Sequence, residues 1–376
     1  MLFKAGQFFN FMRIGLFIPN ATFDLPGSSE VGGIEVFAFE LGEAMRALGH
    51  EVILFGGEPK AGKGYRASNL KVELAPYWET AKIWNLGSRF RKLVQRLHFA
   101  QAIAPRIRDS KLDLMVVFKP YDFINAFRWR HLGFKVVMNY QGKDFFPTDR
   151  FWKQWIDAEF ACSDENARLA QSRYGILPKT FSNAVESDFF KPGEKSKGDH
   201  SGRFRILTAG RMVGWKGLCT LIPVLEKMPE VEWWAAGDGP EREKLIAQAE
   251  AAGVADRFKV LGVLENEKLR EAMQEADLMI QPSWDFDACP TAVLQGMSCG
   301  LPLILSDQVG LKSLIQNQGA FQAVTSRDPD SIVKAIRRWR ENPEQFQQAS
   351  EASRREAVER FSWKQLAKAL EAEWSN

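Results

Sequence analysis

Cysteine, histidine and long apolar runs are all scarce in this sequence of 376 residues. The four cysteines, Cys162, Cys219, Cys289 and Cys299, lie far apart and form no Cys-x-x-Cys pair. This excludes a disulfide framework or a zinc site of ordinary spacing and predicts a reducing, cytoplasmic location. No apolar run approaches the roughly 18 residues that a membrane span needs. Residues 1–11 have too short an apolar core and no small-residue cleavage site for a signal peptide, so we interpret them as an extension before the first strand.

Charge of either sign is not in excess. The 50 Lys and Arg residues nearly balance the 47 Asp and Glu residues, which leaves a net charge of +3. Such a balance argues against a nucleic-acid partner for the chain as a whole. The hydrophobic fraction of 45% is typical of a globular protein, and the length leaves room for two domains.

Short apolar runs alternate with longer amphipathic ones, a pattern typical of parallel sheets covered by helices. Residues 33–49 show the helical pattern, with apolar residues at Phe37, Ala38, Leu41, Met45 and Leu48. The predicted strands are residues 13–19, 51–57, 112–118, 134–140, 159–163, 204–210, 232–237, 258–262, 277–283 and 301–306.

One stretch, residues 191–203, is rich in Pro, Gly, Ser and charge and lies between two series of strands. We interpret it as a linker between two α/β domains that face each other across a cleft. Ligands of such folds bind outside the carboxyl ends of the strands.

Two glycine-containing loops in the first half are candidates for anion binding. Gly32 and Gly33 stand before a predicted helix, where backbone amides and the helix dipole favour an anion, although a structural turn is equally expected. The stretch from Gly57 to Gly64 imitates a phosphate-binding P-loop. Gly64 occupies the place of the Mg²⁺-binding Ser or Thr, so we interpret this stretch as a surface loop.

In the second half, Arg211 and Lys216 follow a predicted strand at the start of a helix. Two cations there can hold a diphosphate, but their spacing alone fits solvated surface cations better. Gly237 lies in a strand-to-helix turn and Gly262 in a loop whose backbone can contact a flat base. Both also fit simple turns.

The order of the motifs along the chain indicates a resemblance to a known protein family. "NAVESDFFKP", "GRMVGWKG", "GDGPE" and "DACPTAVLQGMSCGLPLI" together resemble the retaining glycosyltransferases of family 4, also called glycosyl transferases group 1. The resemblance runs from Met12 to the C-terminal "FSWKQLAKALEAEW". It implies the GT-B fold, with two Rossmann-like α/β/α domains, residues 1–190 on the acceptor side and 204–360 on the donor side. It also implies that residues 361–376 form a helix returning to the first domain, and that no metal or other cofactor is needed.

Site residues follow from this resemblance by position. Arg211 and Lys216 match the family's Arg and Lys that bind the donor diphosphate. Asp287 stands where the family has a Glu beside the transferred sugar, and Gln295 stands where it has a Glu on the ribose. Neither departure abolishes hydrogen bonding, since Asp is only one methylene shorter than Glu and Gln loses only the charge-assisted part, about 1 kcal/mol.

The segment between these two positions resembles the family's loop near phosphate and sugar. The amides around Cys289 and Thr291 are expected to approach the donor, whereas Pro290 has no N–H to donate. Ala292 is expected to begin a helix, ending at Cys299, whose N-terminus faces the diphosphate.

A third departure lies in the first domain. Gln141 stands where many relatives have a His that faces the donor sugar, and Gln cannot act as an acid or base. The histidines of this chain, among them His50, are expected at the surface or at helix ends.

Residues 78–111 combine eight cations with interleaved aromatic residues. Such a segment can lie on an anionic membrane surface, or it can be a solvated basic face with its aromatic residues in the core.

The leading hypothesis is therefore a metal-independent retaining glycosyltransferase that uses a nucleotide-diphosphate-sugar donor. Its acceptor would be a glycan or a lipid-linked molecule of cell-surface polysaccharide or lipopolysaccharide biosynthesis. The alternatives are a sugar-nucleotide 2-epimerase, or a catalytically weakened partner subunit that binds a nucleotide sugar without turnover.

Overall fold

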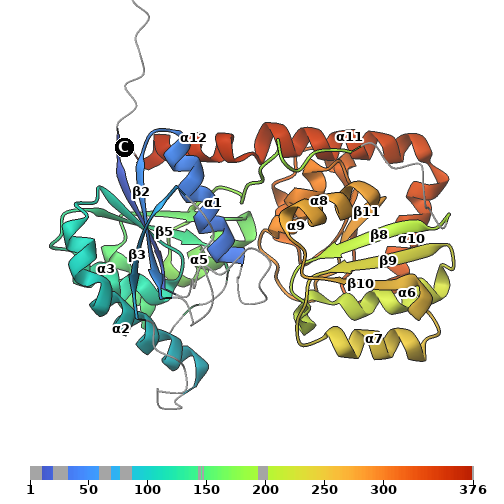
Figure 1. Cartoon of the computed structure of the whole chain (residues 1–376), viewed down its shortest axis with the longest axis horizontal. Helices are drawn as coiled ribbons and strands as arrows, with labels where there is room; N and C mark the ends of the chain where they lie inside the picture. The colour runs from blue at the N-terminus through green and yellow to red at the C-terminus, as the bar shows by residue number, and fades with distance from the viewer. Residues whose placement is uncertain are drawn as a thin grey trace, which may run out of the picture.

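A computed structural model of the chain describes residues 11–19, 33–58, 69–76, 87–142, 145, 148–193 and 202–374. Residues 1–10 of the predicted extension, Gly32 and most of the P-loop-like stretch lie outside these residues. Two parallel sheets, each covered by helices, lie in separate halves of the molecule (Figure 1).

The first sheet has seven strands in the order β3-β2-β1-β4-β5-β6-β7. Its strands are β1 (Arg13–Ile18), β2 (Glu51–Gly57), β3 (Lys71–Ala75), β4 (Leu114–Val117), β5 (Lys135–Tyr140), β6 (Ala158–Ala161) and β7 (Lys179–Thr180). The helices of this half are α1 (Gly33–Ala47), α2 (Ser88–Asp109), α3 (Phe123–Trp129), α4 (Asp149–Trp152) and α5 (Asp164–Tyr174).

Both faces of this sheet are buried, because successive side chains of each strand enter different cores. On β1, Leu16 packs in the cluster that includes α1, whereas Phe17 packs in the cluster that includes α2 and α3. The apolar pattern of α1 is confirmed for Phe37, Ala38, Leu41 and Met45, which are buried. Leu48 follows the end of the helix and is only half-buried.

The second sheet has six strands in the order β10-β9-β8-β11-β12-β13. Its strands are β8 (Phe204–Ala209), β9 (Val231–Ala236), β10 (Phe258–Gly262), β11 (Leu278–Gln281), β12 (Leu303–Ser306) and β13 (Phe321–Val324). The helices of the second half are α6 (Leu221–Lys227), α7 (Arg242–Ala251), α8 (Asn266–Glu275), α9 (Thr291–Ser298), α10 (Pro329–Glu341), α11 (Pro343–Arg360) and α12 (Trp363–Trp374).

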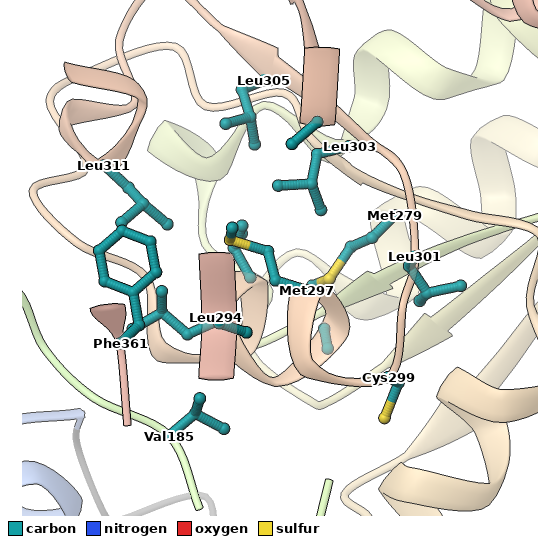
Figure 2. Close-up of a cluster of buried hydrophobic side chains, with 14 of the residues drawn as sticks. Val185, Met279, Leu294, Met297, Cys299, Leu301, Leu303, Leu305, Leu311 and Phe361 are labelled. Atoms are coloured by element: carbon teal, nitrogen blue, oxygen red, sulfur yellow. The ribbon is translucent and has the colours of Figure 1, made fainter. Parts of the chain in front are cut away.

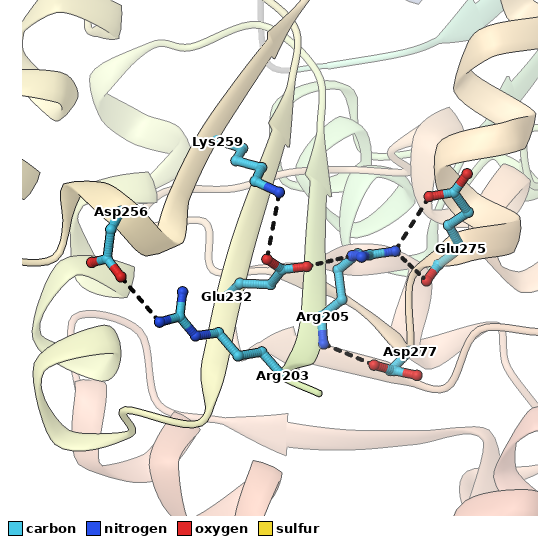
Figure 3. A network of polar contacts seen from close by, with 7 residues as sticks. All are labelled: Arg203, Arg205, Glu232, Asp256, Lys259, Glu275 and Asp277. Carbon is cyan, nitrogen blue, oxygen red and sulfur yellow. Dashed lines mark hydrogen bonds and ion pairs between the residues drawn. The ribbon is translucent and has the colours of Figure 1, made fainter. Parts of the chain in front are cut away.

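A buried ionic network fixes the amino ends of the second sheet (Figure 3). Arg205 of β8 donates through Nε to Oε1 of Glu232 on β9 at 2.6 Å, and through its backbone N–H to Asp277, just before β11, at 2.8 Å. Lys259 of β10 lies 3.7 Å from the other oxygen of Glu232. Four adjacent strands are thereby held in register at one edge.

A second core packs α9 against one face of this sheet. Leu294 and Met297 of α9 pack against Leu303 and Leu305 of β12. Figure 2 shows Phe361 and Val185 next to this helix, so both segments that join the two halves of the molecule contact the same core. The position of α9 is therefore set by packing from both halves.

The C-terminal helix α12 returns to the first half and packs on α1 (Figure 1). The ring centroid of Trp363 lies 5.3 Å from that of Phe37. His50, expected at the surface or a helix end, follows α1 but is only 4% exposed. Its Nδ1 accepts from the backbone N–H of Met12 at 3.3 Å, and its Nε2 lies 3.1 Å from Oε1 of Glu371 on α12. The predicted place of His50 at the end of a helix is thus confirmed, but its side chain is buried and helps to hold α12.

Within the described part of the chain, none of the helices combines the length and the hydropathy of a membrane span.

Candidate active site

The loops after β8 and β9 are joined by their backbones at the carboxyl edge of the second sheet. The N–H of Met212 donates to the carbonyl of Asp238 at 2.8 Å. Gly237 has a φ of 129°, and a Cβ at this position would lie 2.0 Å from the carbonyl oxygen of Gly210. The N–H of Gly237 donates to the carbonyl of Gly262 at 2.6 Å. Both predicted glycines thus support the loop that carries the two predicted cations, while their contact with a ligand stays a prediction.

Lys216 ends a short 3₁₀ helix, Gly214–Lys216, in that loop. Its Nζ lies 2.8 Å from Oδ2 of Asp287 and 4.7 Å from the ring centroid of Trp215. An ammonium group has three N–H donors, so Lys216 can keep this pair and still donate to a ligand. Arg211 is exposed and has no ion-pair partner among the described residues. The structure thus brings Lys216 and Asp287 together and leaves Arg211 open to solvent.

Asp287 is 6% exposed, and one of its carboxylate oxygens is heavily used. Oδ2 accepts hydrogen bonds from Lys216 at 2.8 Å, from the Ser283 hydroxyl at 2.8 Å and from the Gln281 amide at 3.0 Å. Oδ1 accepts no hydrogen bond from a described residue and is the oxygen left for a ligand. Sequence reasoning missed Gln281 and Ser283. The available signal was two polar side chains at the carboxyl end of an otherwise buried strand.

The backbone of Asp287 is clamped as well. Its N–H donates to the carbonyl of Gln308 at 3.0 Å, and its carbonyl accepts from the N–H of Gly310 at 2.8 Å. A Cβ on Gly310 would lie 2.5 Å from the Ala288 carbonyl oxygen and 2.8 Å from the hydroxyl of Ser163, which belongs to the first half of the molecule. Gly310 is another residue that sequence reasoning missed, and its small size lets three segments meet beside Asp287.

Helix α9 begins at Thr291, within one residue of the predicted start at Ala292. Pro290 precedes it in extended conformation and caps it without a side-chain hydrogen bond. The first amides of a helix have no intrahelical acceptor, so this end of α9 can bind an anion. Gln295, one turn further, is half-buried and its side-chain amide has no partner among the described residues. It therefore keeps its hydrogen-bonding capacity for a ligand.

Cys289 lies at the contact between the two halves. Its carbonyl accepts a hydrogen bond from the buried side-chain amide of Asn183 at 2.8 Å. Its side chain shares a buried cluster with Cys162, which follows β6 of the first sheet. Burial raises the pKa of Cys162 to about 12 and raises that of Cys289 well above its usual range. Both thiols therefore stay protonated near neutral pH and serve packing rather than nucleophilic chemistry.

The first half contributes Gln141 and Gly33 to the carboxyl edge of its own sheet. Gln141 follows β5 and donates its side-chain amide to Oδ1 of Asn139 at 2.9 Å, which leaves its Oε1 without a donor among the described residues. Gly33 is the exposed first residue of α1, with open space around its Cα. No hydrogen bond between described residues joins either of them to Asp287.

Among the described residues, no group of three or more His, Cys, Asp and Glu side chains is placed to hold a metal ion.

Two family profiles match successive parts of the sequence. Residues 31–189 match "Glycosyltransferase Family 4", and residues 191–356 match "Glycosyl transferases group 1". Together they span every described strand except β1, and they include the loop and helix around Asp287.

Known proteins with full-length similarity agree with these profiles. The chain is 23% identical to the phosphatidyl-myo-inositol mannosyltransferase of Mycobacterium leprae, covering 95% of this chain and 94% of that protein. The sucrose-phosphate synthase of Thermosynechococcus elongatus has a similar structure, with a TM-score of 0.84, 17% identity and coverage of 97% and 98%. Anabaena HepE, solved with UDP and glucose, matches with a TM-score of 0.77, 16% identity and coverage of 97% and 99%.

Proposed function

Because the chain belongs to the glycosyl transferases group 1 family and has the GT-B fold, we propose that it is a metal-independent, retaining glycosyltransferase. The donor is a nucleotide-diphosphate sugar. The acceptor is a glycan or lipid-linked molecule of cell-surface polysaccharide or lipopolysaccharide biosynthesis. Support for a lipid-linked acceptor comes from the mycobacterial relative, whose name gives a phosphatidylinositol as the molecule that it mannosylates.

The observation that carries this proposal is the Lys216–Asp287 pair beside the start of α9. When the bond between the anomeric carbon and the diphosphate breaks, negative charge builds on the leaving oxygen. Lys216, Arg211 and the first amides of α9 are the groups that stabilise this charge. The diphosphate oxygen takes the proton of the acceptor hydroxyl as that hydroxyl bonds to the anomeric carbon.

Asp287 has a different role in this scheme. Its Oδ2 is already held by three donors, so Oδ1 orients a hydroxyl of the transferred sugar. Gln295 accepts a hydrogen bond from the ribose, and Gln141 donates to or accepts from the sugar without exchanging a proton. Gly33, together with Gly32 before it, contributes backbone groups to the donor cleft.

A donor screen tests this proposal. The purified chain is incubated with UDP-, GDP-, ADP- and dTDP-sugars, and the melting temperature and the release of nucleoside diphosphate are recorded with and without extracted lipid-linked glycans. The expected result is a raised melting temperature with one base, together with diphosphate release that Asp287→Asn lowers at least tenfold. Binding without release, even with acceptor present, would instead indicate a partner subunit that binds without turnover. An isomerised donor in the absence of acceptor would indicate an epimerase.

For the acceptor side we propose contact with the inner face of the cytoplasmic membrane through α2 and its flanks. The exposed basic face of α2 is smaller than the sequence predicted, since Arg96 is buried against Asp122 and Phe99 lies in the core. Trp78 and Trp84 lie outside the described residues. Lys92 and Lys111 remain exposed. The test is flotation at low salt, where recovery with anionic vesicles is expected to exceed recovery with neutral ones, and equal recovery refutes the contact.

A further inference from the structure

A cationic cavity of about 390 Å³ lies on the first half of the molecule, between α2 and the end of α3. Its lining includes Arg108 of α2 together with Arg128, Arg130 and His131 around the end of α3. Cavities that bind small molecules begin at about 300 Å³, so this one is large enough for a phosphorylated group.

The cavity is far from the candidate active site. Arg130 and His131 precede β5, whereas Gln141 follows the carboxyl end of the same strand. A six-residue strand spans about 20 Å, so the two lie at opposite edges of the sheet. The cavity is thus not part of the cleft in which the donor is proposed to bind.

Three guanidinium groups around this cavity have no carboxylate partner in the part of the chain that the structure describes. Arg108, Arg128 and Arg130 form no ion pair with any described residue. Elsewhere on the same helix Arg96 is paired with Asp122, and Arg106 lies 3.4 Å from Glu73. Like charges that share a cavity repel one another, and an anion between them removes this repulsion.

Two of these groups are held in fixed positions. Arg130 donates to the carbonyl of Phe127 at 2.7 Å and stacks on its ring at 4.0 Å. Arg128 donates to the carbonyl of Leu97 on α2 at 3.3 Å. A guanidinium group has five N–H donors, so each arginine keeps most of its donors for a ligand. Fixed, planar forks of this kind suit the oxygens of phosphate.

We propose that this cavity is a second anion-binding site, specific for a phosphate group and separate from the donor site. The phosphate belongs either to a membrane lipid headgroup or to a soluble phosphorylated molecule, and both present the same tetrahedral oxyanion to the three arginines.

The test measures binding of inorganic phosphate by isothermal titration calorimetry at constant ionic strength. Lys216→Ala serves as the parent chain, because it weakens the proposed diphosphate clamp in the cleft, and the phosphate binding that then depends on Arg108 and Arg130 reports on the cavity. Adding Arg108→Gln and Arg130→Gln is expected to weaken this binding at least tenfold. Lys334→Gln with Arg337→Gln removes the same charge from the exposed face of α10 and is expected to leave it unchanged.

A single substitution controls for misfolding of the double variant. Arg108 is exposed and its side chain has no hydrogen bond with a described residue, so Arg108→Glu leaves the packing intact while reversing one charge. Equal phosphate affinity in the parent, the double variant and Arg108→Glu would overturn the proposal.

Flotation with vesicles of phosphatidylcholine alone, or with added phosphatidic acid, then shows whether the phosphate belongs to a lipid headgroup or to a soluble molecule. A lipid headgroup predicts that Arg108→Glu reduces recovery with phosphatidic acid only. A soluble ligand predicts unchanged recovery together with lost phosphate binding.

Discussion

At the scale of single residues, the candidate site depends on how one carboxylate is shared. Asp287 gives one oxygen to Lys216, Gln281 and Ser283 and keeps the other for a ligand. The shorter side chain of Asp, compared with the Glu of the family, places this carboxylate close to its own loop. The protein donors therefore position the group before any substrate binds, which lowers the reorganisation needed during reaction.

The cysteines provide a pH-dependent prediction at this scale. Burial raises the pKa of all four thiols, so the reactive thiolate is scarce at pH 7.5 and increases as the pH rises. Cys162, Cys289 and Cys299 are also shielded, whereas Cys219 is half-buried. A colorimetric disulfide reagent is expected to modify at most one thiol of the native chain, and this reaction is expected to disappear in Cys219→Ser. Two or more thiols reacting rapidly in the native chain would contradict the packing of the contact between the two halves.

At the scale of helices and strands, the central strands could be predicted, whereas three of the four edge strands could not. Strands such as β1 and β4 are buried on both faces and appear as continuous apolar runs. β3, β7 and β13 were missed because an edge strand is short or half-exposed and carries polar residues at alternate positions. The inward orientation of Arg96 on α2 was also missed, since it depends on Asp122, a partner distant in sequence.

The buried ionic network in Figure 3 is predicted to stabilise the second sheet. Arg205→Met leaves the carboxylate of Glu232, which is 1% exposed, without its main partner and is expected to lower the free energy of unfolding by about 3 kcal/mol. Arg203→Met breaks only an exposed pair with Asp256, and its expected cost is below about 1 kcal/mol. Urea unfolding measures both. Equal costs for the two variants would contradict a structural role for the buried network.

At the scale of the whole molecule, the C-terminal helix ties the two halves together. The family resemblance led us to expect its return to the first half, and the structure shows Trp363, Leu366, Leu370 and Trp374 in the buried cluster with α1. No periodicity within α12 itself identifies this partner. The same holds for the contact of Asn183 with Cys289, which joins residues 106 positions apart. Contacts between the halves depend on the tertiary arrangement, which local sequence patterns do not contain.

Trp363 therefore supplies a prediction for this scale. Trp363→Ala removes a 7% exposed indole from the contact of α12 with α1 and is expected to destabilise the first half by about 3 kcal/mol. Phe151→Ala, at a residue that is 59% exposed, serves as the matched control and is expected to change stability by less than about 0.5 kcal/mol. Thermal unfolding is followed by far-ultraviolet circular dichroism, which reports on the backbone and not on tryptophan. The melting temperatures of the two variants are then compared. An unchanged melting temperature for Trp363→Ala would mean that α12 is not part of the folded core.

The family resemblance allowed the candidate site residues to be predicted from the sequence. The residues that hydrogen-bond to them could not be predicted in this way. Lys216 lies 2.8 Å from Asp287, and α9 begins four residues after Asp287, while the roles of these groups in donor binding stay predictions. Gln281 and Ser283 become recognisable only when the carboxyl end of β11 is placed beside Asp287.

Titration of UDP, GDP, ADP and dTDP into the wild-type chain, Lys216→Ala and the exposed control Lys334→Ala tests the central claim most directly. One nucleoside diphosphate is expected to bind the wild type and the control equally. Lys216→Ala is expected to weaken that binding by about 1.5 to 3 kcal/mol, roughly 10- to 150-fold, through loss of a charged hydrogen bond to the diphosphate. Failure of all four nucleotides to bind, or equal binding by Lys216→Ala, would contradict a donor site at the Lys216–Asp287 pair.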